Sequence, residues 1–205
     1  GHAGAMTMSC FRLCLFGDSF ANGTGDDTMM GWAGRVCASA RRRGHDVTLY
    51  NLGIRRDTSS DIFARWQEEA TRRLPPQHEG RLIFAFGAND CVIENGGPRV
   101  PLSRSLENAR AILTTARQSH PVLMLGPVPV SDPVADIGIE ALTLELAKLC
   151  ASLAIPFLPL RPVIRACPSW IAEVEAGDGA HPNAGGYAAI AEAVESWKAW
   201  RAWAP

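Results

Sequence analysis

A serine, a histidine and an aspartate stand where they could form a nucleophilic centre. Ser19 ends the sequence Gly17-Asp18-Ser19 after a short apolar run, and His181 stands three residues after Asp178. A serine hydroxyl becomes a useful nucleophile when a base accepts its proton, and a carboxylate can orient that base. The short spacing lets Asp178 reach His181 Nδ1 within one loop. This pattern predicts acyl transfer, with Ser19 as nucleophile, His181 as base and Asp178 as its partner.

Acyl transfer also needs hydrogen-bond donors where the carbonyl oxygen gains negative charge. Gly53 and Asn89 each follow another apolar run, so both stand where a strand is expected to end. We predict that the backbone N–H groups of Ser19 and Gly53 and the side-chain amide of Asn89 form this oxyanion hole. Glycine suits the role because, without a Cβ, its backbone can approach the substrate closely.

Five short apolar runs alternate with longer segments of helical period, a pattern that predicts strands followed by helices. The expected strands cover residues 11–16, 47–52, 82–86, 122–125 and 156–158, and the expected helices cover 31–43, 59–73, 103–119, 134–153 and 184–203. The runs are apolar throughout, as in a parallel sheet with helices on both faces. We therefore expect an α/β fold, a flavodoxin-like three-layer α/β/α sandwich with a five-stranded parallel sheet in the order 2-1-3-4-5. This order brings the first three strand ends together.

Four blocks of the chain resemble those of one enzyme family. The blocks are Gly17-Asp18-Ser19, Gly53, Gly87-Ala88-Asn89-Asp90 and Asp178-Gly179-Ala180-His181. In order and spacing they are similar to the blocks of the SGNH hydrolases, also called GDSL-type esterases and lipases, and they span nearly the whole chain. The resemblance implies the flavodoxin-like fold and carboxylic ester hydrolysis without a cofactor or a metal. It also implies the roles given above to the serine, glycine, asparagine, histidine and aspartate.

The sequence departs from the family pattern at two places. Phe20 follows the first block where the family has leucine, a position expected to face packing. Residues 54–57, Ile-Arg-Arg-Asp, follow Gly53 where many relatives carry a second glycine. We expect this second departure to change the shape of the loop, and of an acyl or leaving-group pocket beside it, but not the triad.

Composition narrows the range of partners. Hydrophobic residues make up 47% of the chain and charged residues 20%, and the net charge is −1. Such a balance is typical of a globular protein without the positive field that attracts nucleic acid or anionic membrane. No apolar run is long enough for a membrane span, and the histidines show no paired metal-ligand spacing.

The six cysteines are scattered and no signal peptide is evident, which favours a cytoplasmic location. Residues 1–7 are interpreted as an expression scar with the native start at Met6 or Met8, and residues 8–205 as one domain of the SGNH hydrolase kind.

Several activities fit the same residues. We favour an esterase or thioesterase, lipase-like in the broad sense, that acts on a small-molecule ester of a small or medium acyl group. A carbohydrate O-deacetylase or an acyltransferase would use the same triad. A non-catalytic flavodoxin-like binding module would use the same loops to hold a phosphate or an acyl group. The sequence leaves open the natural substrate, the acyl-chain length, hydrolysis against transfer, and whether the chain forms a homo-oligomer.

Three other segments invite interpretation. Residues 91–100 and the proline-rich residues 126–133 follow expected strands, and we predict that they form the substrate wall. Trp197, Trp200 and Trp203 recur every three residues near the end of the chain. This stripe favours core packing, with a contact between subunits as the alternative. Residues 23–28 begin like a dinucleotide-binding sequence but lack its third glycine and stand too far from the preceding strand.

Overall fold

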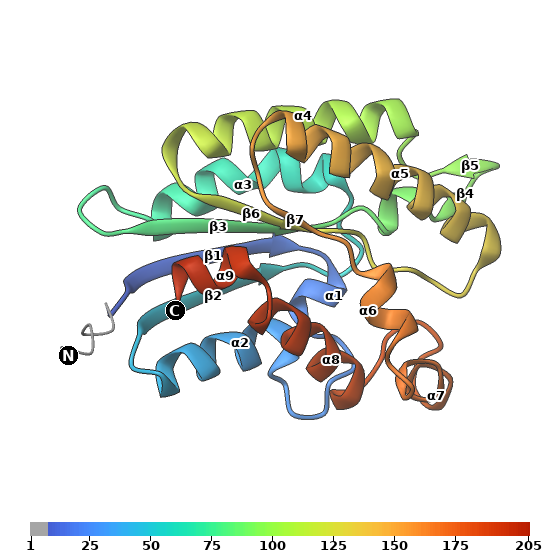
Figure 1. Cartoon of the computed structure of the whole chain (residues 1–205). Coiled ribbons are helices and arrows are strands. Elements are labelled where there is room, and N and C mark those ends of the chain that lie inside the picture. The colour runs from blue at the N-terminus through green and yellow to red at the C-terminus, as the bar shows by residue number, and fades with distance from the viewer. Residues whose placement is uncertain (1–7) are drawn as a thin grey trace.

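A five-stranded parallel sheet separates two layers of helices in the computed structural model of the chain, which describes residues 8–205 (Figure 1). Its strands are β1 (Cys10–Gly17), β2 (Asp46–Gly53), β3 (Gly80–Ala85), β6 (Val122–Leu125) and β7 (Phe157–Leu158). They pair in parallel in the order β2-β1-β3-β6-β7. When only the five strands of this sheet are numbered along the chain, their order is 2-1-3-4-5. The predicted α/β class and three-layer sandwich are confirmed. Residues 1–7, interpreted above as a scar, lie outside the described residues.

Helices cover both faces of the sheet (Figure 1). One layer holds α3 (Ser59–Arg73), α4 (Leu102–Ser119) and α5 (Pro133–Ser152), and the other holds α2 (Gly31–Arg42), α8 (Ala184–Glu195) and α9 (Lys198–Trp203). The central strands are buried on both sides, and Leu15 and Phe84 are fully inaccessible. Burial of each such side chain contributes about 1.5–3 kcal/mol, which is why uniformly apolar runs become central strands. None of the helices within residues 8–205 is long and apolar enough to cross a membrane.

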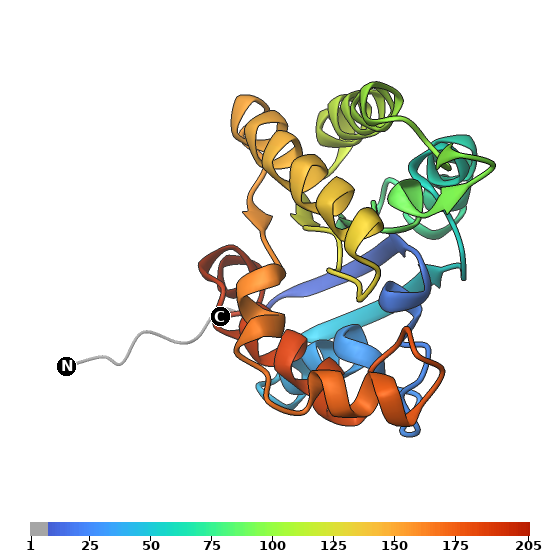
Figure 2. The same cartoon turned by 90° about the vertical axis from the view of Figure 1, so that its right-hand side faces the viewer.

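Short elements that periodicity does not resolve lie at the carboxyl ends of the strands, the side that faces the viewer in Figure 2. They are α1 (Ser19–Asn22), the 3-10 helix η1 (Asn89–Cys91), the hairpin of β4 (Ile93–Glu94) and β5 (Gly97–Pro98), α6 (Arg161–Arg165) and α7 (Trp170–Ala176). Each is shorter than the window over which a periodic signal is measurable. These elements build the surroundings of the site.

The expected last helix is interrupted, which corrects the prediction of one helix over 184–203. Helix α8 ends at Glu195, and Trp197 has extended backbone before α9 begins. The break lets α9 fold back, so that Trp200 is fully buried and its ring meets Phe11 edge-on at 6.2 Å. Trp203 meets the same ring at 6.3 Å. Trp200 and Trp203 thus belong to the core, the first of the two interpretations above.

Candidate active site

Ser19 lies at the first turn after the central strand. Strand β1 ends at Gly17, where a Cβ would collide with the backbone of Ala85 on the neighbouring strand. Asp18 then caps α1 by accepting the Phe20 N–H at 3.0 Å. Burial raises the pKa of Asp18 to about 7, although backbone N–H groups of α1 oppose this effect. The glycine and the aspartate are therefore explained by packing and capping, and they aim Ser19 at the edge of the sheet.

The structure brings Ser19, His181 and Asp178 into one hydrogen-bonded chain. His181 Nε2 lies 2.7 Å from Ser19 Oγ, and His181 Nδ1 lies 2.6 Å from Asp178 Oδ2. The ring of Phe20 packs on the imidazole with centroids 4.9 Å apart. With the Nδ1 proton directed to the carboxylate, Nε2 is free to accept the serine proton.

Asp178 is held by the loop that carries the histidine. Its Oδ1 accepts the backbone N–H groups of His181 at 2.8 Å and Ala180 at 2.9 Å. Partial burial raises the pKa of Asp178, but these two bonds and the imidazole outweigh burial and lower the pKa to about 2. The carboxylate therefore stays ionised over the whole neutral and mildly acidic range.

Asn89 opens η1, which residues 86–88 separate from the end of β3. Its Nδ2 donates to the Asp57 carbonyl at 3.0 Å, and an amide nitrogen carries a second hydrogen that can serve another acceptor. The next residue, Asp90, is fully buried and accepts the hydroxyls of Ser59 and Ser105, both at 2.6 Å. Burial raises the pKa of Asp90 against these bonds. Asp90 thus anchors η1 to α3 and α4 and fixes the direction of Asn89.

Gly53 lies beside the serine turn, but its N–H is already in use. A Cβ on Gly53 would lie 2.5 Å from the Asn22 nitrogen and 2.8 Å from the Asp18 carbonyl, so only glycine fits against α1. The Gly53 N–H donates to Asn51 Oδ1 at 3.1 Å, and Asn51 Nδ2 donates to the Ala21 carbonyl at 2.9 Å. The expected reason for a glycine was close approach to a substrate, whereas the structure shows close approach to α1 and an N–H that is engaged.

The loop after Gly53 contains a residue whose importance the sequence did not indicate. Ile54 donates its N–H to the Gly17 carbonyl at 3.1 Å, and Asp57 closes a turn onto Ile54 at 3.2 Å. Arg56 inside this turn has a φ of 71°, a left-handed conformation that favours glycine. Within residues 8–205, the Arg56 N–H meets no backbone or side-chain acceptor. The missing second glycine pointed to the loop of residues 54–57 but not to Arg56 within it.

Side chains from the β4–β5 hairpin hold this turn. The Arg56 guanidinium donates to Glu94 Oε1 at 2.7 Å, and the Arg56 carbonyl accepts from Arg99 Nη1 at 2.8 Å. The turn that lacks its glycine is therefore bridged to the segment that follows Asn89.

Two cavities flank these residues. One, of about 280 Å³, is almost wholly apolar and lies between the hairpin and α5. Its walls include Cys91, Ile93, Pro98, Val134 and Ile137. The other, of about 420 Å³, is lined about equally by polar and apolar groups and reaches His181, with Asp27, Glu173 and Asp178 in its walls. Of the predicted substrate wall, residues 91–100 contribute to the apolar cavity, whereas Gly126, Pro127 and Val128 line only a narrow space beside Phe20.

Comparisons with solved structures agree with this architecture. An α/β hydrolase enzyme, LAE5, from the metagenome of Lake Arreo, Spain, has a TM-score of 0.76 at 16% identity, covering 96% of this chain and 98% of its own. Axe2, an acetylxylan esterase from Geobacillus stearothermophilus, has a TM-score of 0.74 at 15% identity, covering 94% and 97%. A G-D-S-L family protein from Desulfitobacterium hafniense DCB-2, described as lipolytic, has a TM-score of 0.70 at 18% identity, covering 90% and 97%.

At such low identities these structures show the shared fold. No curated protein matches the sequence. The sequence itself matches the GDSL-like lipase/acylhydrolase family over residues 15–189, a range that runs from the end of β1 into α8 and includes the hydrogen-bonded Ser19, His181 and Asp178. A match of that extent, on the fold that such enzymes share, places this chain in the GDSL-like lipase/acylhydrolase family of carboxylic ester hydrolases.

Proposed function

We propose that the chain hydrolyses esters of small or medium acyl groups through a covalent acyl-enzyme on Ser19. The 2.7 Å contact between Ser19 Oγ and His181 Nε2 carries this proposal. Ser19 Oγ attacks the ester carbonyl carbon while His181 takes its proton, and His181 then gives that proton to the departing alcohol. Water, deprotonated by His181, attacks the acyl-enzyme and releases the acid. Asp178 stabilises the imidazolium in both halves of the reaction.

Similarity to Axe2 supports the same two residue types. Two structures of that esterase are described as catalytic mutants, one with a serine and one with a histidine replaced by alanine. In this chain the serine and histidine that meet at the carboxyl edge are Ser19 and His181.

The oxyanion is held by donors from three strand ends. The Ser19 N–H and the second hydrogen of Asn89 Nδ2 supply two of them. Two backbone N–H groups are candidates for the third donor. The Gly53 N–H must first break its hydrogen bond to Asn51 Oδ1, whereas the Arg56 N–H has no acceptor among the described residues. A donor that needs no rearrangement costs the enzyme no reorganisation during the reaction.

The apolar cavity is the proposed place of the acyl group. Cys91 in its wall belongs to η1 together with Asn89, so the cavity begins beside the oxyanion donors. The leaving alcohol must lie on the His181 side to receive its proton, which leaves the opposite side for the acyl chain. Each methylene buried there is worth about 0.8 kcal/mol, or roughly fourfold in specificity.

Chain-length profiles test this placement. Ile137 is exposed at the mouth of the cavity, so Ile137→Asp replaces apolar wall there by a solvated charge and should lower kcat/KM for p-nitrophenyl octanoate relative to acetate by about three- to tenfold. Leu144→Asp is the matched control, because Leu144 is exposed on the same helix but lies outside the cavity. Equal chain-length profiles in the two variants would contradict the placement of the acyl group in this cavity.

A carbohydrate O-deacetylase is the second candidate. The cavity at His181 offers the carboxylates of Asp27 and Asp178 to the hydroxyl groups of a sugar leaving group. A substrate panel decides between the two candidates: p-nitrophenyl esters of increasing length, acetylated xylo-oligosaccharides and an acyl-CoA. A preference for the acetylated sugar over every simple ester of equal acyl length would identify a deacetylase.

Labelling of Ser19 tests the catalytic centre itself. A fluorophosphonate probe should label the wild-type protein and not Ser19→Ala, and the same variant should lose about 10⁴–10⁶ of p-nitrophenyl acetate turnover. A non-catalytic binding module would not react with the fluorophosphonate probe. An acyltransferase would react with the probe at Ser19 but would transfer the acyl group to an added alcohol in preference to water. Turnover by Ser19→Ala at the wild-type rate would end the proposal.

A further inference from the structure

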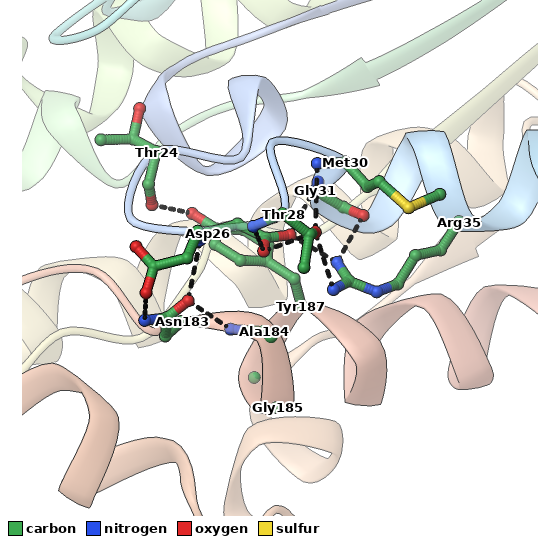
Figure 3. Close-up of polar contacts among 12 residues, drawn as sticks. Thr24, Asp26, Thr28, Met30, Gly31, Arg35, Asn183, Ala184, Gly185 and Tyr187 are labelled. Atoms are coloured by element: carbon green, nitrogen blue, oxygen red, sulfur yellow. Dashed lines mark hydrogen bonds and ion pairs between the residues drawn. The ribbon is translucent and has the colours of Figure 1, made fainter.

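The loop between α1 and α2, residues 23–30, lies against the residues that follow His181 (Figure 3), and apart from Asp27 in the wall of the cavity at His181 it takes no part in the mechanism above. Within this loop, Gly25 faces His181 and Pro182 and has a φ of 96°. A Cβ at Gly25 would lie 2.5 Å from the Pro182 carbonyl and 3.1 Å from the Cβ of His181. Any side chain at this position would therefore push the histidine or the loop away from its observed place.

A buried carboxylate stiffens the 23–30 loop from inside. Asp26 is 3% exposed and accepts the N–H groups of Thr28 and Gly31, each at 2.9 Å, and Arg35 Nη1 at 2.5 Å. Burial raises the pKa of Asp26, but these bonds outweigh burial and lower the pKa to about 2. Figure 3 shows the guanidinium and the loop amides gathered around this one side chain. The loop is thus fixed to the start of α2.

Two bonds then join the loop to the residues just after His181. The Asp27 N–H donates to Asn183 Oδ1 at 2.9 Å, and Asn183 Nδ2 donates back to Asp27 Oδ2 at 2.9 Å. Asn183 also caps α8 by accepting the Ala184 N–H at 2.8 Å. Tyr187 on α8 donates its hydroxyl to the Thr24 carbonyl at 2.6 Å. Thr24, Asn183 and Tyr187 are seen side by side in Figure 3.

We propose that the 23–30 loop is a positioning element for His181. Gly25 and the Asp27–Asn183 pair hold the histidine backbone at the distance from Ser19 that proton transfer needs, an inference that rests on the proposed function. The loop starts at the C-cap of α1, the helix of Ser19, and it contacts the start of α8, the helix after His181. It is a second link between nucleophile and base, separate from the hydrogen bond that they share.

The other neighbours of His181 act differently. Asp178 and Phe20 contact the imidazole ring and orient it, whereas Gly25 faces the backbone of Pro182 and the Cβ of His181, which a Cβ at Gly25 would meet. A displacement of about 1 Å in a reacting group can cost roughly 10² in rate. A small shift of this backbone should therefore lower kcat while leaving substrate binding nearly intact.

The first experiment compares two glycines with the same backbone strain. Gly25→Ala should lower kcat for p-nitrophenyl acetate by about 10–100-fold with KM within about twofold of wild type. Gly44→Ala is the control, because Gly44 has a φ of 98° but lies before β2, at the amino ends of the strands and away from the site. A Cβ at Gly44 would meet only the end of the exposed Met8 side chain. The two variants should unfold at similar temperatures. Equal kcat values in the two variants would overturn the inference.

A second pair of variants avoids strain altogether. Asp27 is exposed, so Asp27→Ala removes the acceptor for Asn183 Nδ2 without a cost in the core. We expect kcat to fall about three- to tenfold in Asp27→Ala and to return to within about twofold of wild type in Asp27→Asn, which keeps an oxygen at that place. Wild-type kcat in Asp27→Ala, or no recovery in Asp27→Asn, contradicts the inference. An inactive wild type would overturn the proposed function as well, which separates the two failures.

Discussion

Replacing Asp178 by asparagine would exchange one oxygen for an N–H₂ group and leave the shape of the side chain unchanged. The new side-chain amide would keep its oxygen as the acceptor for the backbone N–H groups of His181 and Ala180, now 2.8 and 2.9 Å away. Its nitrogen would then face His181 Nδ1 across the present 2.6 Å contact. Two N–H groups cannot share that contact, so the imidazole proton would move from Nδ1 to Nε2. His181 would donate to Ser19 instead of accepting its proton.

The expected loss follows from this change of tautomer and from the lost stabilisation of the imidazolium. In another Ser-His-Asp enzyme the same substitution lowers kcat about 10⁴-fold, equivalent to roughly 5.5 kcal/mol in the activation barrier. The Asp178 side chain is 44% exposed, so water screens part of its charge. We therefore expect Asp178→Asn to lose about 10³–10⁴ in kcat for p-nitrophenyl acetate.

Stability measurements separate this effect from unfolding. Because the pKa of Asp178 is lowered to about 2, its ionised form stabilises the folded state above the ordinary carboxylate pKa, and this contribution is lost as the pH falls towards 2. After allowance for its exposure, that contribution is about 1 kcal/mol, or roughly 2–4 °C in Tm at neutral pH. Asp178→Ala, which also removes both backbone acceptors, should lose more stability than Asp178→Asn. A rate for Asp178→Asn within tenfold of wild type would refute the assigned role of the carboxylate.

Three further predictions concern other parts of the site and the core. Burial raises the pKa of Asp18 to about 7, so the folded state keeps a proton that the unfolded chain releases above pH 4. The free energy of unfolding should therefore fall by up to about 4 kcal/mol between pH 4 and 7. Urea unfolding at pH 5 and 8 should show a smaller loss in Asp18→Asn than in the wild type. An equal pH dependence in both proteins would contradict the raised pKa. Asn89→Ala should lose about 10²–10³ in kcat, while fluorophosphonate labelling of Ser19 stays detectable. An unchanged rate would contradict a role for Asn89 in the oxyanion hole. Trp200→Ala should cost about 3–5 kcal/mol in urea unfolding, because Trp200 is fully buried against Phe11, whereas a cost below about 1 kcal/mol would speak against core packing.

The course of the sheet was predictable from local patterns. Apolar runs buried on both faces identify central strands, and parallel strands connected by helices follow few topologies. From this alone Ser19 and Asn89 had to lie at neighbouring strand ends, and His181 was the histidine with a carboxylate at a useful spacing. The contact between Ser19 and His181, 162 residues apart, agrees with that choice of histidine.

The short elements were not predictable in the same way. The break at Trp197 and the hairpin after η1 depend on what the segments meet in three dimensions: α9 turns back because Trp200 and Trp203 can then cover Phe11. A periodic pattern gives the apolar face of a helix but not the point at which tertiary packing ends it.

The sequence by itself determined the fold class and the residues that meet at the carboxyl edge, because strand and helix periodicity act over short distances along the chain. Only the tertiary structure decided which amides are free and what holds the histidine. The Gly53 N–H is taken by Asn51, the Arg56 N–H is left without an acceptor in the described residues, and Gly25 abuts His181. Each of these facts depends on which hydrogen bonds and contacts the folded loops make, and no spacing in the sequence records those choices.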